Sequence, residues 1–272
     1  MIYADYTASG RSLTFIEEYI RDAVLPYYAN THTETSFTGA QTTALREEAR
    51  EIIREAVNGT EQDQVIFCGS GATTAINKLI DLLNIRLPRD LADKHQLNEQ
   101  ISAEDRPVVF IGPHEHHSNE LPWHESIADV VSILLRPCGH IDLDELERQL
   151  NAYEDRYLLI GSFSAASNVT GVKSNVPGVT GLLNKYGALS FWDYAAAAPY
   201  VSIDLNGTTP IDAISFSAHK FVGGPGTTGV LVAKDFIFKN AVPAIVGGGR
   251  VVYVTPEDHY IERLQNYGNI AT

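Results

Sequence analysis

The sequence predicts an α/β fold of three layers, with helices covering both faces of a mostly parallel sheet. Short β-rich runs alternate with helix-like segments along the chain, and this alternation is typical of parallel sheets. The 272 residues are 44% hydrophobic, which is enough for one sizeable core. In sheets of this kind, ligands bind beyond the carboxyl ends of the strands, so we expect a site there.

Seven short runs rich in apolar and β-branched residues are predicted to be the strands. They cover residues 64–68, 107–112, 130–135, 157–163, 188–193, 212–217 and 229–233. The first run leads into a glycine-rich turn and a helix over residues 69–83. The polar stretch 87–107 is expected to be an excursion between elements and not a domain boundary.

Three further segments have helical patterns. Residues 142–153 and 176–187 lie between predicted strands, and Pro177 and Gly187 suit the start and the end of the second helix. Residues 42–57 place their apolar side chains at helical spacing, which indicates an amphipathic helix. Its apolar face consists of Leu45, Ala49, Ile52, Ile53, Ala56 and Val57.

The net charge of −14 at pH 7 limits the classes of binding partner. An acidic surface repels phosphate backbones and anionic lipid, so we expect neither nucleic acid nor a membrane as a partner. The two cysteines cannot form a disulfide framework, and the N-terminus lacks the pattern of a signal peptide. The longest apolar runs are too short to cross a bilayer. These features predict a cytoplasmic protein.

The first candidate site is the turn Cys68–Thr73, where a predicted strand enters glycines and then a helix. Free N–H groups and the helix dipole at such a helix start bind anions. Ser70, Thr73 and Thr74 add hydroxyl donors. A tight turn with a Ser/Thr cap explains the same residues equally well, because the pattern is neither a Walker loop nor a G-x-G-x-x-G motif.

The second candidate is the cluster His114–His117, which follows the strand predicted at 107–112. A metal site is one interpretation, but no third ligand follows at a known spacing, so we expect no metal. An imidazole stacked on a flat aromatic ligand is a second interpretation. A solvated polar turn is the third.

The third candidate is Asp193, the last residue of the strand predicted at 188–193. A carboxylate at the end of a buried strand is costly unless it is paired, and a protonated pyridine nitrogen would pair it. The ordinary alternative is a helix N-cap, since Asp is common at that position.

The fourth candidate is Lys220, within the stretch SFSAHKFVGGPGTTGVLV at 215–232. An amine that must reach a carbonyl and form a Schiff base needs partly desolvated surroundings. Ser217 and His219 would grip a phosphate, and the glycines would let the backbone approach closely. The alternative is a surface lysine in a glycine loop, which is the usual environment of a lysine.

Together the four clusters fit one ligand that carries a phosphate, a flat ring, a basic ring nitrogen and an aldehyde. Pyridoxal 5'-phosphate has all four groups, and a lysine Schiff base with an aspartate partner is typical of its enzymes. The pairing of nitrogen and carboxylate keeps the ring protonated. The ring then accepts electrons from a substrate carbanion.

The sequence resembles the class V aminotransferase family of fold-type-I pyridoxal-phosphate enzymes, especially its cysteine desulfurase and selenocysteine lyase branch. The resemblance extends over nearly the whole chain and rests on YADYTAS, GSGATTAIN, EHHSNELPW, SNVTG, SFSAHKFVGGPGTTGVLV and the GGG at 247–249. It implies a three-layer large domain with a mostly parallel, mixed sheet of seven strands. It also implies a homodimer in which a loop of the other subunit completes each site.

The resemblance further implies roles for individual residues. Lys220 would form the Schiff base, Asp193 would pair the pyridine nitrogen, and His116 would stack on the ring and help to move protons. Asn168 would lie near the ring hydroxyl and the substrate carboxylate. The phosphate would be held by Ala72, Thr73, Ser217 and His219.

Departures from the family pattern affect these roles. Ala196 stands three positions after Asp193, where the family usually has a Gln that contacts the ring oxygen. Desulfurases of the family take the sulfur on a cysteine of their C-terminal region, whereas this chain has no cysteine after Cys138. Cys68 and Cys138 are expected to be structural. The arginine that grips the substrate carboxylate in the family also belongs to that C-terminal region.

We expect three regions along the chain. An N-terminal segment covers 1–20, the cofactor-binding large domain covers 21–245, and the start of a truncated C-terminal region covers 246–272. The small C-terminal domain of the family would then be largely absent.

The leading interpretation is a pyridoxal-phosphate enzyme that acts on a small amino acid. It would be a relative of cysteine desulfurase or selenocysteine lyase, with a sulfur-acceptor protein as a further partner. A class V aminotransferase or a β-eliminating lyase is the alternative enzyme, since neither needs an acceptor cysteine. A truncated, non-catalytic binding protein with the same fold is the third interpretation.

Overall fold

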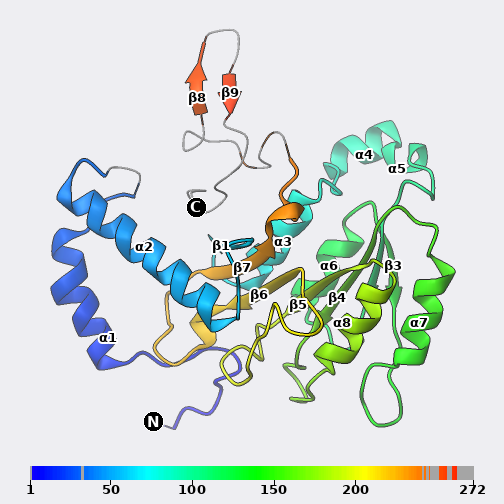
Figure 1. Ribbon diagram of the computed structural model, residues 1–272, viewed down its shortest axis with the longest axis horizontal. Helices are drawn as coiled ribbons and strands as arrows, with labels where there is room; N and C mark the ends of the chain where they lie inside the picture. Colours follow the sequence, from blue (N-terminus) through cyan, green and yellow to red (C-terminus); the bar gives the residue numbers. More distant parts are fainter. Residues whose placement is uncertain are drawn as a thin grey trace.

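The computed structural model describes residues 2–31, 34–240, 242, 245, 251–255 and 259–261. Its centre is a seven-stranded sheet in the order β1-β7-β6-β5-β4-β2-β3 (Figure 1). Strands β6, β5, β4, β2 and β3 are parallel, whereas β7 runs antiparallel to both β6 and β1. The strands are β1 (Asp63–Cys68), β2 (Val108–Ile111), β3 (Asp129–Ser132), β4 (Leu159–Ser164), β5 (Leu189–Asp193), β6 (Ala213–Ser217) and β7 (Gly229–Lys234).

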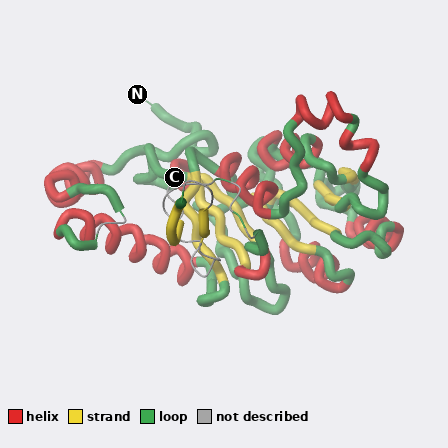
Figure 2. Tube along the Cα trace, turned by 90° about the horizontal axis from the view of Figure 1, so that it is seen from above, coloured by secondary structure: helices red, strands yellow, loops and turns green. Residues whose placement is uncertain are grey.

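Helices cover both faces of this sheet, as the view from above shows (Figure 2). Helices α3 (Ala72–Leu82) and α6 (His117–His124) pack on one face, against side chains such as Val109 and Ile111. Helices α7 (Leu143–Ala152) and α8 (Val176–Lys185) pack on the other face. Successive strand residues point to opposite faces, so each buried strand contributes to both cores.

The prediction of a three-layer fold with a mixed, mostly parallel sheet of seven strands is confirmed. Each predicted strand overlaps one observed strand. Strand β3 is shorter than the predicted run 130–135, because the chain leaves the ladder after Ser132 and Leu134 is exposed. The polar stretch 87–107 forms two short helices, α4 (Arg89–His95) and α5 (Leu97–Gln100).

The predicted amphipathic helix 42–57 corresponds to α2 (Phe37–Ala56). Its apolar face is only partly covered: Val57 is buried, but Ile52 is 59% exposed. Arg50 is buried instead, with its guanidinium 5.7 Å from the centre of the Phe67 ring. Leu45, Ala49 and Ile53 of the predicted face are partly buried, so helical spacing identified the helix and most of the side that faces the protein, but not the burial of Arg50 there.

An N-terminal arm precedes α2 and consists of α1 (Thr14–Tyr19), a π-helical turn η1 (Ile20–Val24) and a 3-10 turn η2 (Leu25–Tyr27). None of these three elements contains a buried residue. Near the other end of the chain, β8 (Val251–Val254) and β9 (His259–Ile261) form a separate antiparallel pair. The rest of the predicted region 246–272, apart from residue 255, lies outside the described residues, and the domain boundaries stay predictions.

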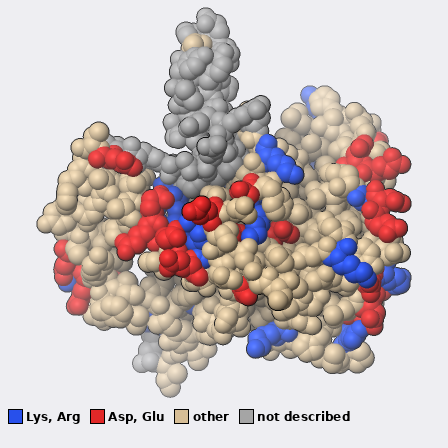
Figure 3. All heavy atoms as spheres, viewed as in Figure 1, with Lys and Arg blue, Asp and Glu red and all other residues tan. Residues whose placement is uncertain are grey.

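The described surface mixes acidic and basic side chains. On the face in Figure 3, Lys and Arg lie between groups of Asp and Glu, and no broad basic area is seen among the described residues. Within the same part of the chain, every helix is too short or too polar to cross a membrane.

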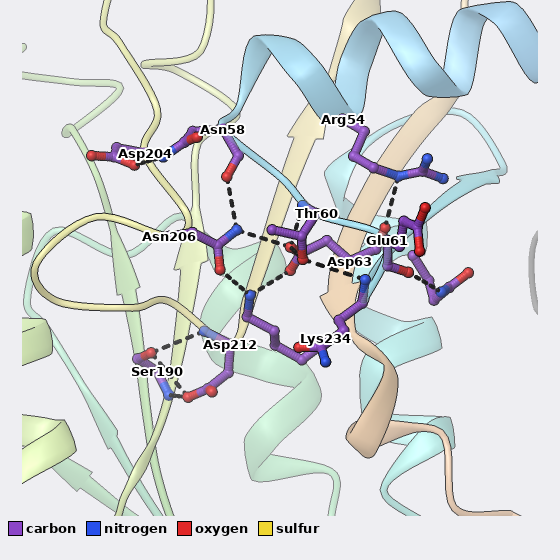
Figure 4. A network of polar contacts seen from close by, with 12 residues as sticks. Arg54, Asn58, Thr60, Glu61, Asp63, Ser190, Asp204, Asn206, Asp212 and Lys234 are labelled. Carbon is purple, nitrogen blue, oxygen red and sulfur yellow. Dashed lines mark hydrogen bonds and ion pairs between the residues drawn. The ribbon is translucent and has the colours of Figure 1, made fainter.

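A buried ion pair joins β1 to β7 at the end of the sheet opposite the glycine-rich turn (Figure 4). Asp63 is fully buried, and the Lys234 ammonium lies 2.7 Å from one of its carboxyl oxygens. The other oxygen accepts the Thr60 backbone N–H and the Asn206 side-chain amide. Burial pushes the pKa of Asp63 up, but Lys234 and the other two donors outweigh it and hold this pKa below its ordinary value.

Lys234→Met is expected to lower the free energy of unfolding at neutral pH by about 3 kcal/mol, because it leaves a buried carboxylate without its cation. Urea unfolding measures this loss. The matched control is Lys185→Met, which removes an exposed ion pair with Glu147 and should change stability little.

The deficit of the Lys234 variant should shrink in acid, and the sign follows from the Asp63 pKa. In the wild type the lowered pKa gives stability that is lost as the pH falls through it. In the variant, buried Asp63 has no cation, so its protonation on folding becomes favourable. Equal losses for the two lysine variants at neutral pH would show that the buried Asp63–Lys234 pair contributes no more to stability than an exposed ion pair.

Candidate active site

A pocket of about 580 Å³ lies at the carboxyl ends of the parallel strands. The loops after β1, β2, β4, β5 and β6 and the N-terminal segment all contribute to its wall. The structure brings all eight predicted site residues together here, while the roles predicted for them stay predictions. These residues are Ala72, Thr73, His116, Asn168, Asp193, Ser217, His219 and Lys220.

Lys220 ends a 3-10 turn, η3 (Ala218–Lys220), which directly follows β6. Its side chain is half-buried and lines the pocket. The N-terminal segment packs on this turn, where the Gly10 backbone N–H donates to the His219 carbonyl oxygen at 2.9 Å. A Cβ at Gly10 would lie 1.8 Å from the Phe221 carbonyl oxygen, so this approach requires glycine. The turn that carries Lys220 is therefore packed against the N-terminal segment.

Asp193 is the last residue of β5 and is 5% exposed. Its Oδ1 accepts the Ala195 backbone N–H at 2.7 Å, so the carboxylate also caps the turn that follows the strand. Burial raises the pKa of Asp193 above its ordinary value, and the positive charges of Lys220 and His116 act in the opposite direction. A cationic ligand atom in the pocket would stabilise the ionised carboxylate further.

The glycine-rich turn after β1 brings the start of α3 beside the end of β6. The Ala72 backbone N–H donates to Ser217 Oγ at 2.9 Å, so this N–H already has a partner. The Thr73 and Ser118 hydroxyl oxygens lie 2.7 Å apart. A Cβ at Gly71 would lie 3.1 Å from Ser217 Oγ, which explains the small residue at this contact. The turn therefore gathers hydroxyl and N–H donors at a helix start, as an anion site requires.

His116 is the N-cap residue of α6, and its Nδ1 accepts the Ser118 backbone N–H at 3.1 Å. A ring nitrogen that accepts carries no hydrogen, so a neutral His116 has its proton on Nε2. His114 contacts the Gly139 carbonyl oxygen instead of the pocket. Among the residues that the structure describes, no three His, Cys, Asp or Glu side chains converge as metal ligands.

Asn168 lies in the loop after β4, which the Ser167 side chain organises by accepting the backbone N–H groups of Val169 and Thr170. Ala196 also lines the pocket. The position at which the resemblance predicts a Gln is therefore part of the pocket wall.

The pocket wall includes residues to which sequence reasoning gave no role. Asp5, Thr7 and Ala8 come from the N-terminal segment, and Ser164 comes from the end of β4. The stretch YADYTAS contributed to the family resemblance, and this was the only signal for the first three. Nothing in the sequence around Ser164 distinguishes it from other serines.

Neither of the two cysteines lines the pocket. Cys68 is buried, and burial raises the pKa of its thiol to about 11. A thiol with such a pKa is a poor nucleophile at neutral pH. Cys138 is exposed, in the loop between β3 and α7.

Comparison with solved structures supports the fold. The apo structure of cysteine desulfurase from Thermococcus onnurineus NA1 matches with a TM-score of 0.76 and 22% identity, over 96% of this chain and 60% of that one. A NifS-like protein from Rickettsia africae matches with a TM-score of 0.72 and 23% identity, over 92% of this chain and 62% of that one. At this identity the likeness shows the fold alone.

Two of the curated proteins that the chain resembles are each named a probable cysteine desulfurase. The one from Halalkalibacterium halodurans is 27% identical over 258 residues, which are 93% of this chain and 58% of the relative. The one from Streptomyces coelicolor is 24% identical over 257 residues, or 93% and 57%. The chain thus spans less than two thirds of the curated relatives that it matches. The sequence model described as aminotransferase class-V matches residues 2–266, and the chain belongs to this family.

Proposed function

We propose that the pocket binds pyridoxal 5'-phosphate and that Lys220 holds it covalently. The observation that carries this proposal is the meeting of Lys220, Asp193 and the turn before α3 in one pocket. An amine, a buried carboxylate and a set of N–H and hydroxyl donors match the aldehyde, the ring nitrogen and the phosphate of this cofactor.

The polar groups of the pocket match the phosphate at one end of the cofactor and the ring at the other. The backbone at Ala72 and the side chains of Thr73, Ser217 and His219 would hold the phosphate, and α3 has no acidic residue in its first turn that would repel it. Asn168 would lie near the ring hydroxyl. When bound, the cofactor would supply a protonated ring that accepts electrons from a substrate carbanion.

The protein residues would control protons and orientation. The buried Asp193 carboxylate would keep the proton on the ring nitrogen, since an ion pair relieves the cost of its burial. Once its amine is no longer bound to the cofactor, Lys220 would take a proton from the substrate α-carbon and return it. His116, whose Nδ1 is occupied by Ser118, would act on the pocket through Nε2.

The reaction that we propose is that of a cysteine desulfurase or selenocysteine lyase relative, acting on a small amino acid. The names of the curated relatives support this class. The alternative is an aminotransferase or a β-eliminating lyase. This alternative needs no acceptor thiol, and neither of the chain's two cysteines lines the pocket. A non-catalytic binding protein with this fold is the remaining alternative.

The partners follow from the same proposal. A desulfurase would pass its sulfur to an acceptor protein, and both would act in the cytoplasm. We also expect a homodimer. Its support is the cluster of exposed apolar side chains on the N-terminal arm and the start of α2, which includes Phe15, Tyr19, Leu25, Tyr28 and Phe37.

After unbound cofactor has been removed, protein treated with pyridoxal phosphate should keep an absorbance band near the visible edge that borohydride removes. After reduction, mass spectrometry should find the cofactor on the peptide that contains Lys220. Lys220→Ala should lose the band and the modified peptide, while Lys185→Ala, a change at an exposed lysine, should keep both. A band of unchanged strength in the Lys220 variant would refute the assignment.

Asp193→Asn should lower the turnover of L-cysteine by about 10²–10³-fold, because the ring nitrogen loses a preorganised charge partner. Measuring sulfide and keto acid in the same reaction separates the two enzyme classes. With a thiol reductant present to release sulfide from an enzyme persulfide, sulfide with alanine indicates a desulfurase, whereas sulfide with keto acid and ammonia indicates the eliminating alternative.

Cys138→Ser should leave the product ratio and the rate unchanged, since Cys138 does not line the pocket. The assay is the one used for the Asp193 variant. A strong loss of sulfide in the serine variant would instead identify Cys138 as the acceptor and contradict its structural assignment.

A further inference from the structure

Glu115, next to His116, has its carboxyl group behind the pocket wall, where four hydrogen-bond donors surround it. Its Oε1 accepts the backbone N–H groups of Ser164 at 3.0 Å and of Gly112 at 3.3 Å. Its Oε2 accepts the Ser164 hydroxyl at 2.7 Å and the Asn119 side-chain amide at 2.6 Å. Each of the two carboxyl oxygens thus already accepts two hydrogen bonds from the protein.

The different lengths of two neighbouring strands explain why a carboxylate lies there. Strand β2 ends at Ile111, which pairs with Ser162, so Ser164 lies beyond the ladder between β2 and β4. The Glu115 side chain takes the place of the missing strand and accepts the Ser164 backbone N–H. A Cβ at Gly112 would lie 2.9 Å from Glu115 Oε1, so the contact depends on a glycine at that position.

A chain of hydrogen bonds runs from Glu115 into the core between the sheet and α6. The Trp123 indole N–H donates to Ser162 Oγ at 3.0 Å, and the Ser162 hydroxyl donates to Asn119 Oδ1 at 2.7 Å. Asn119 in turn donates to Glu115. Trp123, Ser162 and Asn119 are all at most 2% exposed. Such aligned chains polarise one another, so a change of charge at Glu115 reaches the indole.

The charges around Glu115 are few. Burial, with a smaller contribution from the nearby Asp193 carboxylate on β5, raises the pKa of Glu115 to about 7 against the donors that favour its ionised form. The groups from β2, β4 and α6 that touch Glu115 are uncharged. His116 and Lys220 act on Asp193, and His114 turns to the Gly139 carbonyl oxygen.

We propose that Glu115 is a positioning residue of this pocket, which acts by orienting the hydroxyl of Ser164 beside Asp193. Ser164 lines the pocket and pairs in register with Asp193 across β4 and β5. The inference rests on the proposed function, because it assumes that the pocket holds the cofactor next to Asp193. It adds a group that touches neither cofactor nor substrate.

The orientation depends on the proton of Glu115. When the carboxylate is ionised, the Ser164 hydroxyl donates to it and offers only lone pairs to the pocket. When Glu115 takes up a proton from solvent, its O–H donates to Ser164 Oγ, and the serine hydrogen is free to donate to a ligand. Near neutral pH, the Ser164 hydroxyl would therefore change from a hydrogen-bond acceptor to a hydrogen-bond donor toward the pocket.

The first test uses the two tryptophans of the chain in the cofactor-free protein. The NMR signal of the Trp123 indole N–H should titrate with a midpoint near pH 7, the value about which Glu115 ionises. The Trp192 indole donates to Thr180 on the other face of the sheet, so its signal serves as an internal control. Glu115→Gln should abolish the Trp123 titration, and a titration that persists would overturn the proposal.

The matched control is Glu125→Gln, at the exposed end of α6, which should leave the Trp123 titration as in the wild type. Ser164→Ala is the second variant. It should keep the titration but raise its midpoint by about one unit, because the carboxylate loses one donor. An unshifted midpoint would show that Ser164 does not bind the Glu115 carboxylate.

The second test follows the absorbance of added pyridoxal phosphate across neutral pH. The wild type should show a transition at the same midpoint as the Trp123 signal, and both Glu115→Gln and Ser164→Ala should lose it. A transition unchanged in these variants would leave Glu115 a purely structural role and overturn the proposal. If no variant and no wild type binds the cofactor, the proposed function fails and the positioning role fails with it, whereas the Trp123 titration still reports on Glu115 separately.

Discussion

The buried carboxylate of Asp193 is the constraint on which the arrangement of the pocket depends. At the end of β5 it is cut off from bulk water, and burial raises its pKa. An ionised group in such a place needs a cation or several donors. The protein supplies one backbone N–H and the nearby charges of Lys220 and His116. A ligand atom with a positive charge beside Asp193 would stabilise the ionised carboxylate further.

The sheet topology explains why residues from distant parts of the chain meet at this carboxylate. Strands β4, β5 and β6 are parallel, so their last residues end at one edge. Strand β7 is antiparallel to both β6 and β1, and β1 therefore points the same way as β6. This places the glycine-rich turn after β1 beside Ser217, with the Gly229 backbone N–H bound to the Gly69 carbonyl oxygen. One reversed strand is thus what joins the donor-rich turn to the lysine.

The parts of this design that could be predicted from the sequence are those with local signals. Buried strands appear as apolar runs, and Lys220 and Asp193 stand directly after such runs. The burial of Arg50 on α2 could not be predicted, because it depends on the guanidinium packing on the Phe67 ring and not on helical spacing. The role of the N-terminal segment depends on contacts with residue 219, some 210 positions away. Glu115 was missed because its partners appear only where β2 ends before β4.

The polar side chains at this edge of the sheet have two roles. They accept backbone N–H groups, and they or their partners line the pocket. Backbone N–H groups beyond the end of a ladder or at the start of a helix need acceptors, and side chains supply them: Glu115 for Ser164 and Ser217 for Ala72. The same side chains, or their immediate partners, line the pocket. A ligand that binds there competes for groups that also hold the loops in place. A ligand that used these groups would therefore couple its binding to the order of these loops.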